Sequence, residues 1–265
     1  MITLVGAGNV AHWIVQRLQD SSRFSITQVY SRNISHARKL ADALSAEAVD
    51  DLAALNPDNR IFLFAVSDDA YPVVLPQLPF VLPLALMTSG TVSCRCLQNH
   101  AAAYGVVYPL QTFTKSQDMG KLDAPMCIES DFLGEWKPLV WELARELSPH
   151  CHEVSEAQRA RLHLAAVFAC NFSNAMFTIA HKLLEEKGLP FEMLLPILHQ
   201  TVDKLESLTP SEAQTGPAAR RDTSVMQAHL DSLENDSLRE IYRLMSDLII
   251  QMQENEITAP TVLKK

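Results

Sequence analysis

The sequence predicts an α/β protein in which a doubly wound sheet is followed by an all-α C-terminal region. Three observations support this prediction. A short apolar run over residues 2–5 leads into the glycine turn Gly6-x-Gly8 and then into a segment with helical periodicity. Short apolar runs alternate with amphipathic stretches as far as about residue 155. Beyond that point no strand pattern is readable. We therefore expect a Rossmann-type domain over residues 1–155 and an all-helical domain over residues 156–265.

The glycine turn has the form of a dinucleotide-binding fingerprint. Gly6 allows the tight turn after the first strand, Gly8 leaves room for a pyrophosphate, and Ala11 lets the following helix pack closely. Free N–H groups at the start of that helix point at the phosphates. We expect Gly6, Gly8, Asn9 and Val10 to contact the cofactor, whereas the alternative is an ordinary glycine turn.

The end of the second strand indicates which dinucleotide is bound. Residues 25–30 are typical of a strand, and Ser31 and Arg32 follow it. Sites that prefer NAD carry an acidic residue near this point, where it takes the ribose 2′-hydroxyl, and no acid is present here. Ser31 can donate a hydrogen bond and Arg32 can pair with a 2′-phosphate. The sequence thus favours NADP, the alternative being that Arg32 is simply solvated.

The remaining elements of the first domain follow in order, and their ends suggest further site residues. The pattern predicts helices over 34–45, 52–55 and 135–147, and strands over 60–66, 81–87, 105–108, 126–129 and 151–155. Ligands of such sheets bind beyond the carboxyl ends of the strands. At such ends we expect cofactor contacts from Val66, Ser67, Thr88 and Ser89, and a substrate contact from Gln111.

Composition limits the classes of partner and the compartment. The chain has 265 residues, of which 48% are hydrophobic, and a net charge of −9, which argues against nucleic acid and anionic membranes. The five cysteines have no disulfide-framework or zinc spacing, so we expect no metal site. The first strand begins at residue 2 with no basic segment before it, and we expect a cytoplasmic protein.

A helix free of charged side chains opens the second domain. Residues 162–180 contain no Lys, Arg, Asp or Glu, so we expect a buried helix. One narrow stripe carries His163, Asn171 and Asn174, which suggests a lined cavity and argues against a membrane span. His163 can exchange a proton near neutral pH, and an asparagine can orient a carbonyl or an imine. The alternative is that these side chains bond only to one another or to nearby backbone.

Two further candidate features, a substrate-binding arginine and an amphipathic helix, lie nearer the C-terminus. Arg220 follows Gly216 and Pro217, and an arginine at the start of a helix can clamp a substrate carboxylate or phosphate. The alternative is a local ion pair between an arginine and Asp222. The last helix, residues 237–254, is amphipathic and can pack against the body of the protein or against a second subunit.

Four motifs in this order resemble a known family. They are residues 6–11 (GAGNVA), 108–113 (YPLQTF), 163–172 (HLAAVFACNF) and 215–220 (TGPAAR). The set looks like the bacterial NADP oxidoreductases that join a Rossmann domain to a helical domain of unknown function. It is more distantly similar to pyrroline-5-carboxylate reductase, ketopantoate reductase and the deazaflavin-dependent NADP oxidoreductases. The resemblance covers nearly the whole chain.

The resemblance implies an NADP site on the first domain, a small-molecule substrate in the cleft between the domains, and a homodimer through the C-terminal helices. His163 and Asn171 match the helical motif of the family, and Arg220 matches its Gly-Pro-x-x-Arg element. Two departures stand out. Relatives tend to have His-Pro where this chain has Tyr108 and Pro109, and related reductases often use a lysine on the helix that here lacks one between Arg161 and Lys182.

These observations predict an NADP-dependent reductase or dehydrogenase of a small carbonyl or imine substrate. We expect His163 and Asn171 to act in catalysis, and Gln111, Asn174 and Arg220 to bind the substrate. The competing interpretation is a non-catalytic module that binds NADP(H) as a sensor or regulator. A scaffold that has lost nucleotide binding fits the intact glycines least well.

Overall fold

The computed structural model describes residues 1–114 and 121–254. The chain divides into two compact units, Met1–Met176 and Phe177–Lys265. The predicted domain boundary between residues 155 and 156 is the start of a helix, α5, whereas the division between the units lies farther along the continuous helical segment that α5 begins.

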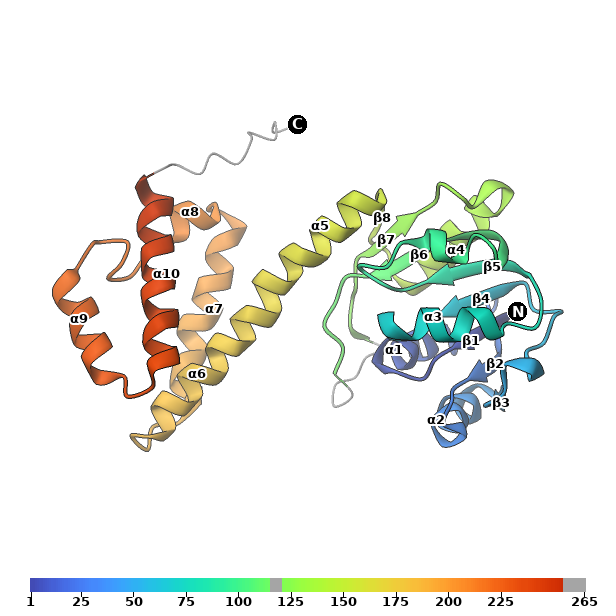
Figure 1. The fold of residues 1–265 in the computed structure, drawn as a ribbon, viewed down its shortest axis with the longest axis horizontal. Helices are drawn as coiled ribbons and strands as arrows, with labels where there is room; N and C mark the ends of the chain where they lie inside the picture. The colour runs from blue at the N-terminus through green and yellow to red at the C-terminus, as the bar shows by residue number, and fades with distance from the viewer. Residues whose placement is uncertain (115–120, 255–265) are drawn as a thin grey trace. The chain divides into compact units, whose positions relative to one another are not determined.

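The first unit contains one eight-stranded sheet in the order β3-β2-β1-β4-β5-β6-β7-β8 (Figure 1). Neighbouring strands are parallel except for the pair of β6 and β7, which is antiparallel. The predicted doubly wound sheet is confirmed. The strands are β1 Ile2–Val5, β2 Ile26–Tyr30, β3 Glu47–Val49, β4 Ile61–Phe64, β5 Leu82–Met87, β6 Ala101–Pro109, β7 Met126–Glu129 and β8 Cys151–Glu153.

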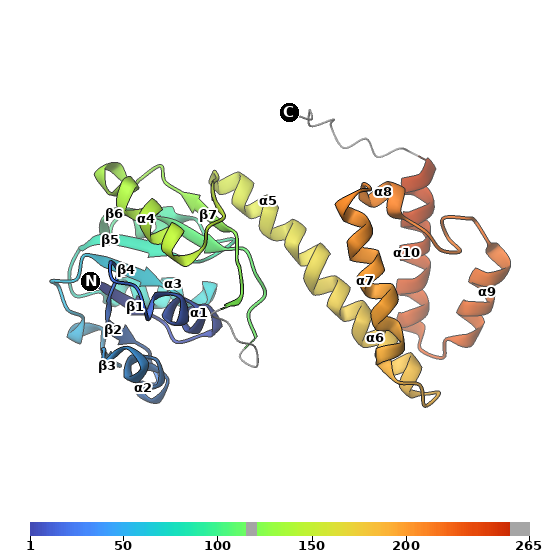
Figure 2. The ribbon, with the colours of Figure 1, turned by 180° about the vertical axis from the view of Figure 1, so that it is seen from behind.

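Helices cover both faces of this sheet (Figures 1 and 2). One core lies between the sheet and the helices α1 (Asn9–Leu18), α2 (Ile34–Ala41) and α4 (Lys137–Leu147). The other core lies beneath the short helix α3 (Tyr71–Val74) and several single turns. Most residues of β1, β4 and β5 are buried on both faces, which explains their continuous apolar runs.

One strand was not predicted from the sequence, and another begins earlier than predicted. β3 has three residues, with Glu47 exposed and Val49 buried, which is too short to give a readable alternation. β6 begins at Ala101 rather than at residue 105, because the alanines before Tyr104 pair with β5 although alanine has a weak strand preference.

A continuous helical segment follows the sheet. It consists of α5 (Glu156–Ala166), a π-helical stretch (Val167–Phe172) and α6 (Ser173–Glu185). Ser155 and Gln158 form a capping box at its start. The expectation of a buried helix is wrong for the isolated chain: residues 160–185 are all exposed or half-buried, and Arg159 alone in this segment is buried.

By length and composition this segment, Glu156–Glu185, passes the test for a membrane-crossing helix, the one candidate among the described residues. Core and interface helices of soluble proteins pass the same test.

The second unit is helical, as predicted for the C-terminal region. It contains part of α6 and the helices α7 (Leu195–Asp203), α8 (Pro210–Ala213), α9 (Thr223–Ser232) and α10 (Asp236–Glu254). α9 and α10 are joined by a bond of 2.8 Å between His229 Nδ1 and the Tyr242 hydroxyl. α7 and α10 run side by side in both views (Figures 1 and 2). Many large apolar side chains of this unit are exposed, Val202 and Leu244 by 66% and 63%.

Candidate functional site

The glycine turn between β1 and α1 has the conformation that the fingerprint requires. Gly6 has a φ of +118°, a value that favours glycine, and a Cβ there would overlap the backbone carbonyl of Ala65. Gly8 is the N-cap of α1, with no side-chain cap, and a Cβ built on it would meet nothing within 4 Å. The backbone therefore passes close to β4 at Gly6 and faces open space at Gly8, where the helix N-terminus offers N–H groups.

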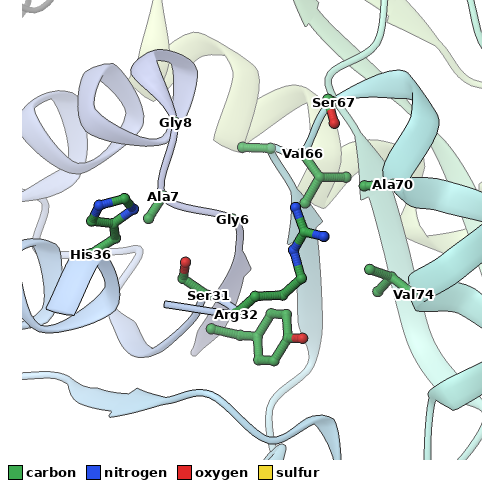
Figure 3. A pocket seen from close by; sticks show the side chains of 12 residues that line it. Gly6, Ala7, Gly8, Ser31, Arg32, His36, Val66, Ser67, Ala70 and Val74 are labelled. Atoms are coloured by element: carbon green, nitrogen blue, oxygen red, sulfur yellow. The ribbon is translucent and has the colours of Figure 1, made fainter. Parts of the chain in front are cut away.

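This turn forms one wall of a cavity of about 310 Å³ (Figure 3). The cavity is lined by six of the residues predicted to bind the cofactor: Gly6, Gly8, Ser31, Arg32, Val66 and Ser67. In Figure 3 Ser31 and Arg32 rise from the end of β2 beneath Gly6, with His36 on one side and Val66 and Ala70 on the other. The described lining contains no carboxylate, which suits a 2′-phosphate.

The structure places four other predicted cofactor residues outside this lining. The Asn9 side-chain amide donates to the carbonyl of Phe113 at 2.7 Å, and Val10 packs against the core. The Thr88 hydroxyl donates to the carbonyl of Phe64 at 3.1 Å. The Ser89 hydroxyl accepts from the N–H groups of Thr91 and Val92 at 3.1 and 2.9 Å. These side chains shape the backbone of the turns that carry them, and their contact with a cofactor stays a prediction.

A second cavity, of about 360 Å³, lies between the segment after β6 and the helix that begins with α5. Three predicted residues meet there: Gln111, His163 and Asn171. Tyr108, Leu110, Phe113, Val167 and Cys170 complete most of the remaining lining. Of the four motifs, the second and third thus face each other across one cavity.

The ring of His163 is in direct contact with Tyr108. The Tyr108 hydroxyl lies 3.0 Å from Nδ1 of His163, and the two rings meet edge to face. Burial raises the pKa of Tyr108 to about 12, so the phenol keeps its proton at neutral pH and can donate to Nδ1. A hydrogen bond at Nδ1 selects the imidazole tautomer that carries its hydrogen on Nε2. His163 is therefore held in one orientation with a second nitrogen available.

The π-helical stretch explains why only part of the predicted polar stripe lines the cavity. His163, Val167, Cys170 and Asn171 line the cavity, but Asn174 does not. A π turn inserts about one residue, which rotates the residues beyond it by roughly 100° relative to a straight α-helix. Asn174 has an interaction partner of its own. Arg220 lies in the second unit, where it is exposed, and its role toward a substrate stays a prediction.

The two cavities lie at one edge of the sheet. β1, β4, β5 and β6 are consecutive parallel neighbours, so Gly6, Val66, Thr88 and Tyr108 all mark carboxyl ends at the same edge. Three strand spacings separate the first from the last, roughly 14 Å. This is the edge at which α/β sheets bind extended dinucleotides.

Among the lining residues that were not predicted from the sequence, two had a detectable signal. His36 lies in the first turn of α2, four residues after Arg32, so a helix starting at Ile34 returns it toward Ser31. Tyr108 ends the predicted strand and stands where relatives have histidine, a position that already indicated a side chain at the site.

Comparisons with known proteins agree with this geometry. Residues 1–85 match the family model described as NADP oxidoreductase, coenzyme F420-dependent, and residues 124–249 match a domain of unknown function, DUF2520. A search of the curated proteins gave no match.

Several solved structures share the fold. A Bacteroides fragilis protein titled "putative NADP oxidoreductase" has a TM-score of 0.87 and 36% identity, over 94% of this chain and 97% of that one. A pyrroline-5-carboxylate reductase from Streptococcus pyogenes has a TM-score of 0.62 and 14% identity, over 94% and 98%. A reductive aminase from Aspergillus terreus, in complex with NADPH and ethyl-5-oxohexanoate, has a TM-score of 0.68 and 17% identity, over 96% and 93%. The resemblance stated from the four motifs is confirmed.

Proposed function

This chain belongs to the family of NADP oxidoreductases that carry a DUF2520 domain, and we propose that it transfers a hydride between NADP(H) and a small carbonyl or imine substrate. Family membership confirms NADP as the predicted cofactor. The observation that most strongly supports the reaction is the Tyr108–His163 pair, which lines a cavity at the same sheet edge as the glycine turn. The substrate would lie in the predicted cleft between the two domains.

The cofactor half of the site follows from the first cavity. The helix N-terminus at Gly8 would receive the pyrophosphate, and Ser31 with Arg32 and His36 would hold the 2′-phosphate. The nicotinamide would lie toward the loop that follows Thr88. When bound, NADPH supplies the hydride, and the protein aligns the reactants and excludes water around them.

The residues of the second cavity would supply the proton that the reduction needs. Reduction of a carbonyl or imine needs one proton for the oxygen or nitrogen in addition to the hydride, and protonated His163 would donate it from Nε2. The Tyr108 hydroxyl can donate to Nδ1 or accept from it, so it would keep the ring in place in both charge states. Asn171 and Gln111 would orient the polar group of the substrate, with Asn174 and Arg220 as further proposed contacts.

Titration of the protein with NADPH and NADH tests the cofactor assignment. We expect the wild-type protein to bind NADPH more tightly than NADH. Arg32→Ala should weaken NADPH binding on the order of tenfold or more, because a charge-assisted pair with the 2′-phosphate is lost, and should leave NADH nearly unchanged. His36→Gln should have the same selectivity and a smaller effect.

Arg23→Ala is the matched control for this titration, since Arg23 is exposed, pairs with Glu142 and lines neither cavity. Equal affinity of the wild-type protein for the two cofactors would refute the roles of Ser31 and Arg32. If neither cofactor bound, the oxidoreductase proposal would fail and the scaffold interpretation would stand.

A second candidate function is a sensor that binds NADP(H) without chemistry. One observation favours it: the Gln111 side chain is already engaged, donating to the carbonyl of Asp123 at 2.9 Å and accepting from the N–H of Thr112 at 2.8 Å. The sensor would be supported if the protein bound NADPH but no carbonyl or imine compound in a broad panel oxidised it.

We also propose that the protein is a homodimer in the cytoplasm. The charge-free helix carries exposed Leu164, Phe168 and Phe172, and Phe168 is 62% exposed. Apolar side chains gathered in this number on one surface usually mark an interface. A second copy of the chain supplies the matching helices. All five cysteines are free, which suits a reducing compartment.

Sedimentation in detergent-free buffer measures this assembly. We expect a species of twice the chain mass, and Phe168→Glu should shift it toward the monomer because a charge would be buried at the interface. Val73→Glu, at an exposed apolar residue of the sheet unit, should leave the mass unchanged. A wild-type monomer, or a protein recovered only with detergent, would contradict the proposal.

A further inference from the structure

One arginine in the first unit is fully buried and joins three separate segments. Arg159, in the first turns of α5, is 0% exposed. Its Nε and Nη2 donate to Glu129 Oε2 at 3.2 and 3.1 Å. Nη1 donates to the carbonyl of Ser89 and Nη2 to the carbonyl of Val92, both at 3.0 Å. The guanidinium thus ties α5 to the end of β7 and to the loop after β5.

The carboxylate of Glu129, which balances the charge of Arg159, is also buried. Glu129 is the last residue of β7, 2% exposed, and its other oxygen accepts from the thiol of Cys94 at 3.0 Å. Burial and this carboxylate raise the pKa of Cys94, so the thiol remains a neutral donor. A buried ion pair satisfied this completely contributes little more stability than well-packed apolar side chains would. A contribution to stability alone therefore explains the presence of the Arg159–Glu129 pair poorly.

The two carbonyls that Arg159 holds stand on either side of Gly90, and Gly90 lies against the candidate catalytic side chain. A Cβ at Gly90 would be 2.5 Å from Nδ1 of His163 and 3.0 Å from Cζ of Tyr108. His163 follows Arg159 by four residues on the same helix, so the two share a helix face. A second bond, from the Ser93 hydroxyl to Glu156 at 2.9 Å, ties the same loop to the same helical turn.

We propose that Arg159, with Glu129 as its counter-charge, is a positioning residue that fixes the loop 89–92 against His163. It thereby sets the distance between the imidazole and the nicotinamide end of the bound dinucleotide. This inference rests on the proposed function, in which the nicotinamide lies over that loop. Arg159 touches neither ligand and acts through the backbone that it holds.

The competing interpretation is that the ion pair supports only the fold. The two interpretations differ in which half of the cofactor they affect. A loosened loop 89–92 weakens contacts with the nicotinamide half but leaves the cavity around Gly6 and Arg32 intact. The fragment 2′,5′-ADP carries the adenosine and the 2′-phosphate without the nicotinamide, so it probes that cavity alone.

The experiment measures NADPH and 2′,5′-ADP affinities by calorimetry for the wild-type protein, Arg159→Lys and the double variant Arg159→Met/Glu129→Gln. The double variant removes both charges and keeps an acceptor for Cys94, so no unpaired charge remains buried. We expect it to bind 2′,5′-ADP within about twofold of wild type and to bind NADPH on the order of tenfold more weakly. Arg159→Lys should restore part of the loss, since one ammonium cannot reach all three acceptors. Arg23→Met, at the exposed ion pair with Glu142, is the control.

A second measurement needs no cofactor. In protein labelled with ¹⁵N-histidine, we expect His163 to show the tautomer with hydrogen on Nε2, and the double variant to lose that preference as the ring leaves Tyr108. The proposal would be overturned if the double variant lost affinity for NADPH and 2′,5′-ADP equally. It would also be overturned if the ratio of these two affinities and the histidine spectrum were both unchanged. If the wild-type protein bound no NADPH, the proposed function would fail separately, and the histidine spectrum alone would decide the role of Arg159.

Discussion

Gly6→Ala is expected to abolish NADPH binding and to lower the free energy of unfolding by about 3 kcal/mol. The residue has a φ of +118°, and the carbonyl carbon of Ala65 would lie 2.7 Å from the new Cβ. Strain at such a φ and overlap with rigid backbone each cost about 1–3 kcal/mol. Relief requires β1 and β4 to separate at the edge where the cofactor binds. Chemical denaturation and NADPH titration measure the two effects.

Gly8→Ala separates the two effects and is the control. Nothing lies within 4 Å of a Cβ at Gly8, and its φ of −81° suits any residue. The unfolding free energy should therefore change by less than about 1 kcal/mol. NADPH affinity should still fall, because the methyl group would occupy the space that the pyrophosphate needs. Tight NADPH binding by both variants would show that this turn does not hold the dinucleotide.

His163→Ala is expected to lower turnover about 10²- to 10⁴-fold while leaving NADPH affinity within about twofold, since general acid–base catalysis contributes on this scale. The side chain lines the second cavity and not the first, and Arg159 still holds the loop 89–92 in this variant, so NADPH affinity should change little. The measurement is the rate at which the fluorescence of bound NADPH is lost with an acceptor that the wild-type protein reduces.

Tyr108→Phe is the companion variant, because it keeps the ring and removes only the hydroxyl that bonds to Nδ1. We expect a smaller loss of turnover than in His163→Ala, since the imidazole would remain but would be less well oriented. Undiminished turnover of His163→Ala would remove His163 from the mechanism. A loss of NADPH affinity as large as the loss of turnover would assign it to cofactor binding.

The first half of the fold was predictable because its signals are local. A buried strand, a glycine turn and an amphipathic helix each leave a pattern within a few residues, and β1, Gly6 and α1 follow it. The direction of β7 was not predictable, because an antiparallel and a parallel strand buried on both faces share the same apolar run. β3 was missed because three residues carry too little periodicity.

The candidate site was predictable where neighbouring residues determine it and not where distant segments meet. Ser31 and Arg32 reach the cofactor cavity because they directly follow a strand. Asn174 was assigned to a stripe that assumed a uniform α-helix, and the π-helical stretch changes the phase before that residue is reached. Arg159 reads as one more polar residue in an exposed first turn, because its three acceptors come from segments 30 or more residues away.

The helix at the glycine turn also supports the other cavity. Asn9 holds the carbonyl of Phe113, and the Trp13 indole, four residues on, donates to the carbonyl of Leu122 at 3.1 Å. A ligand that displaced the N-terminus of α1 would therefore also move the backbone at Phe113, which lines the second cavity. Thermodynamic linkage makes such an effect reciprocal: a factor by which one ligand tightens or loosens the other applies equally in reverse. A dinucleotide at the N-terminus of α1 and a ligand of the second cavity would then be energetically coupled through this helix.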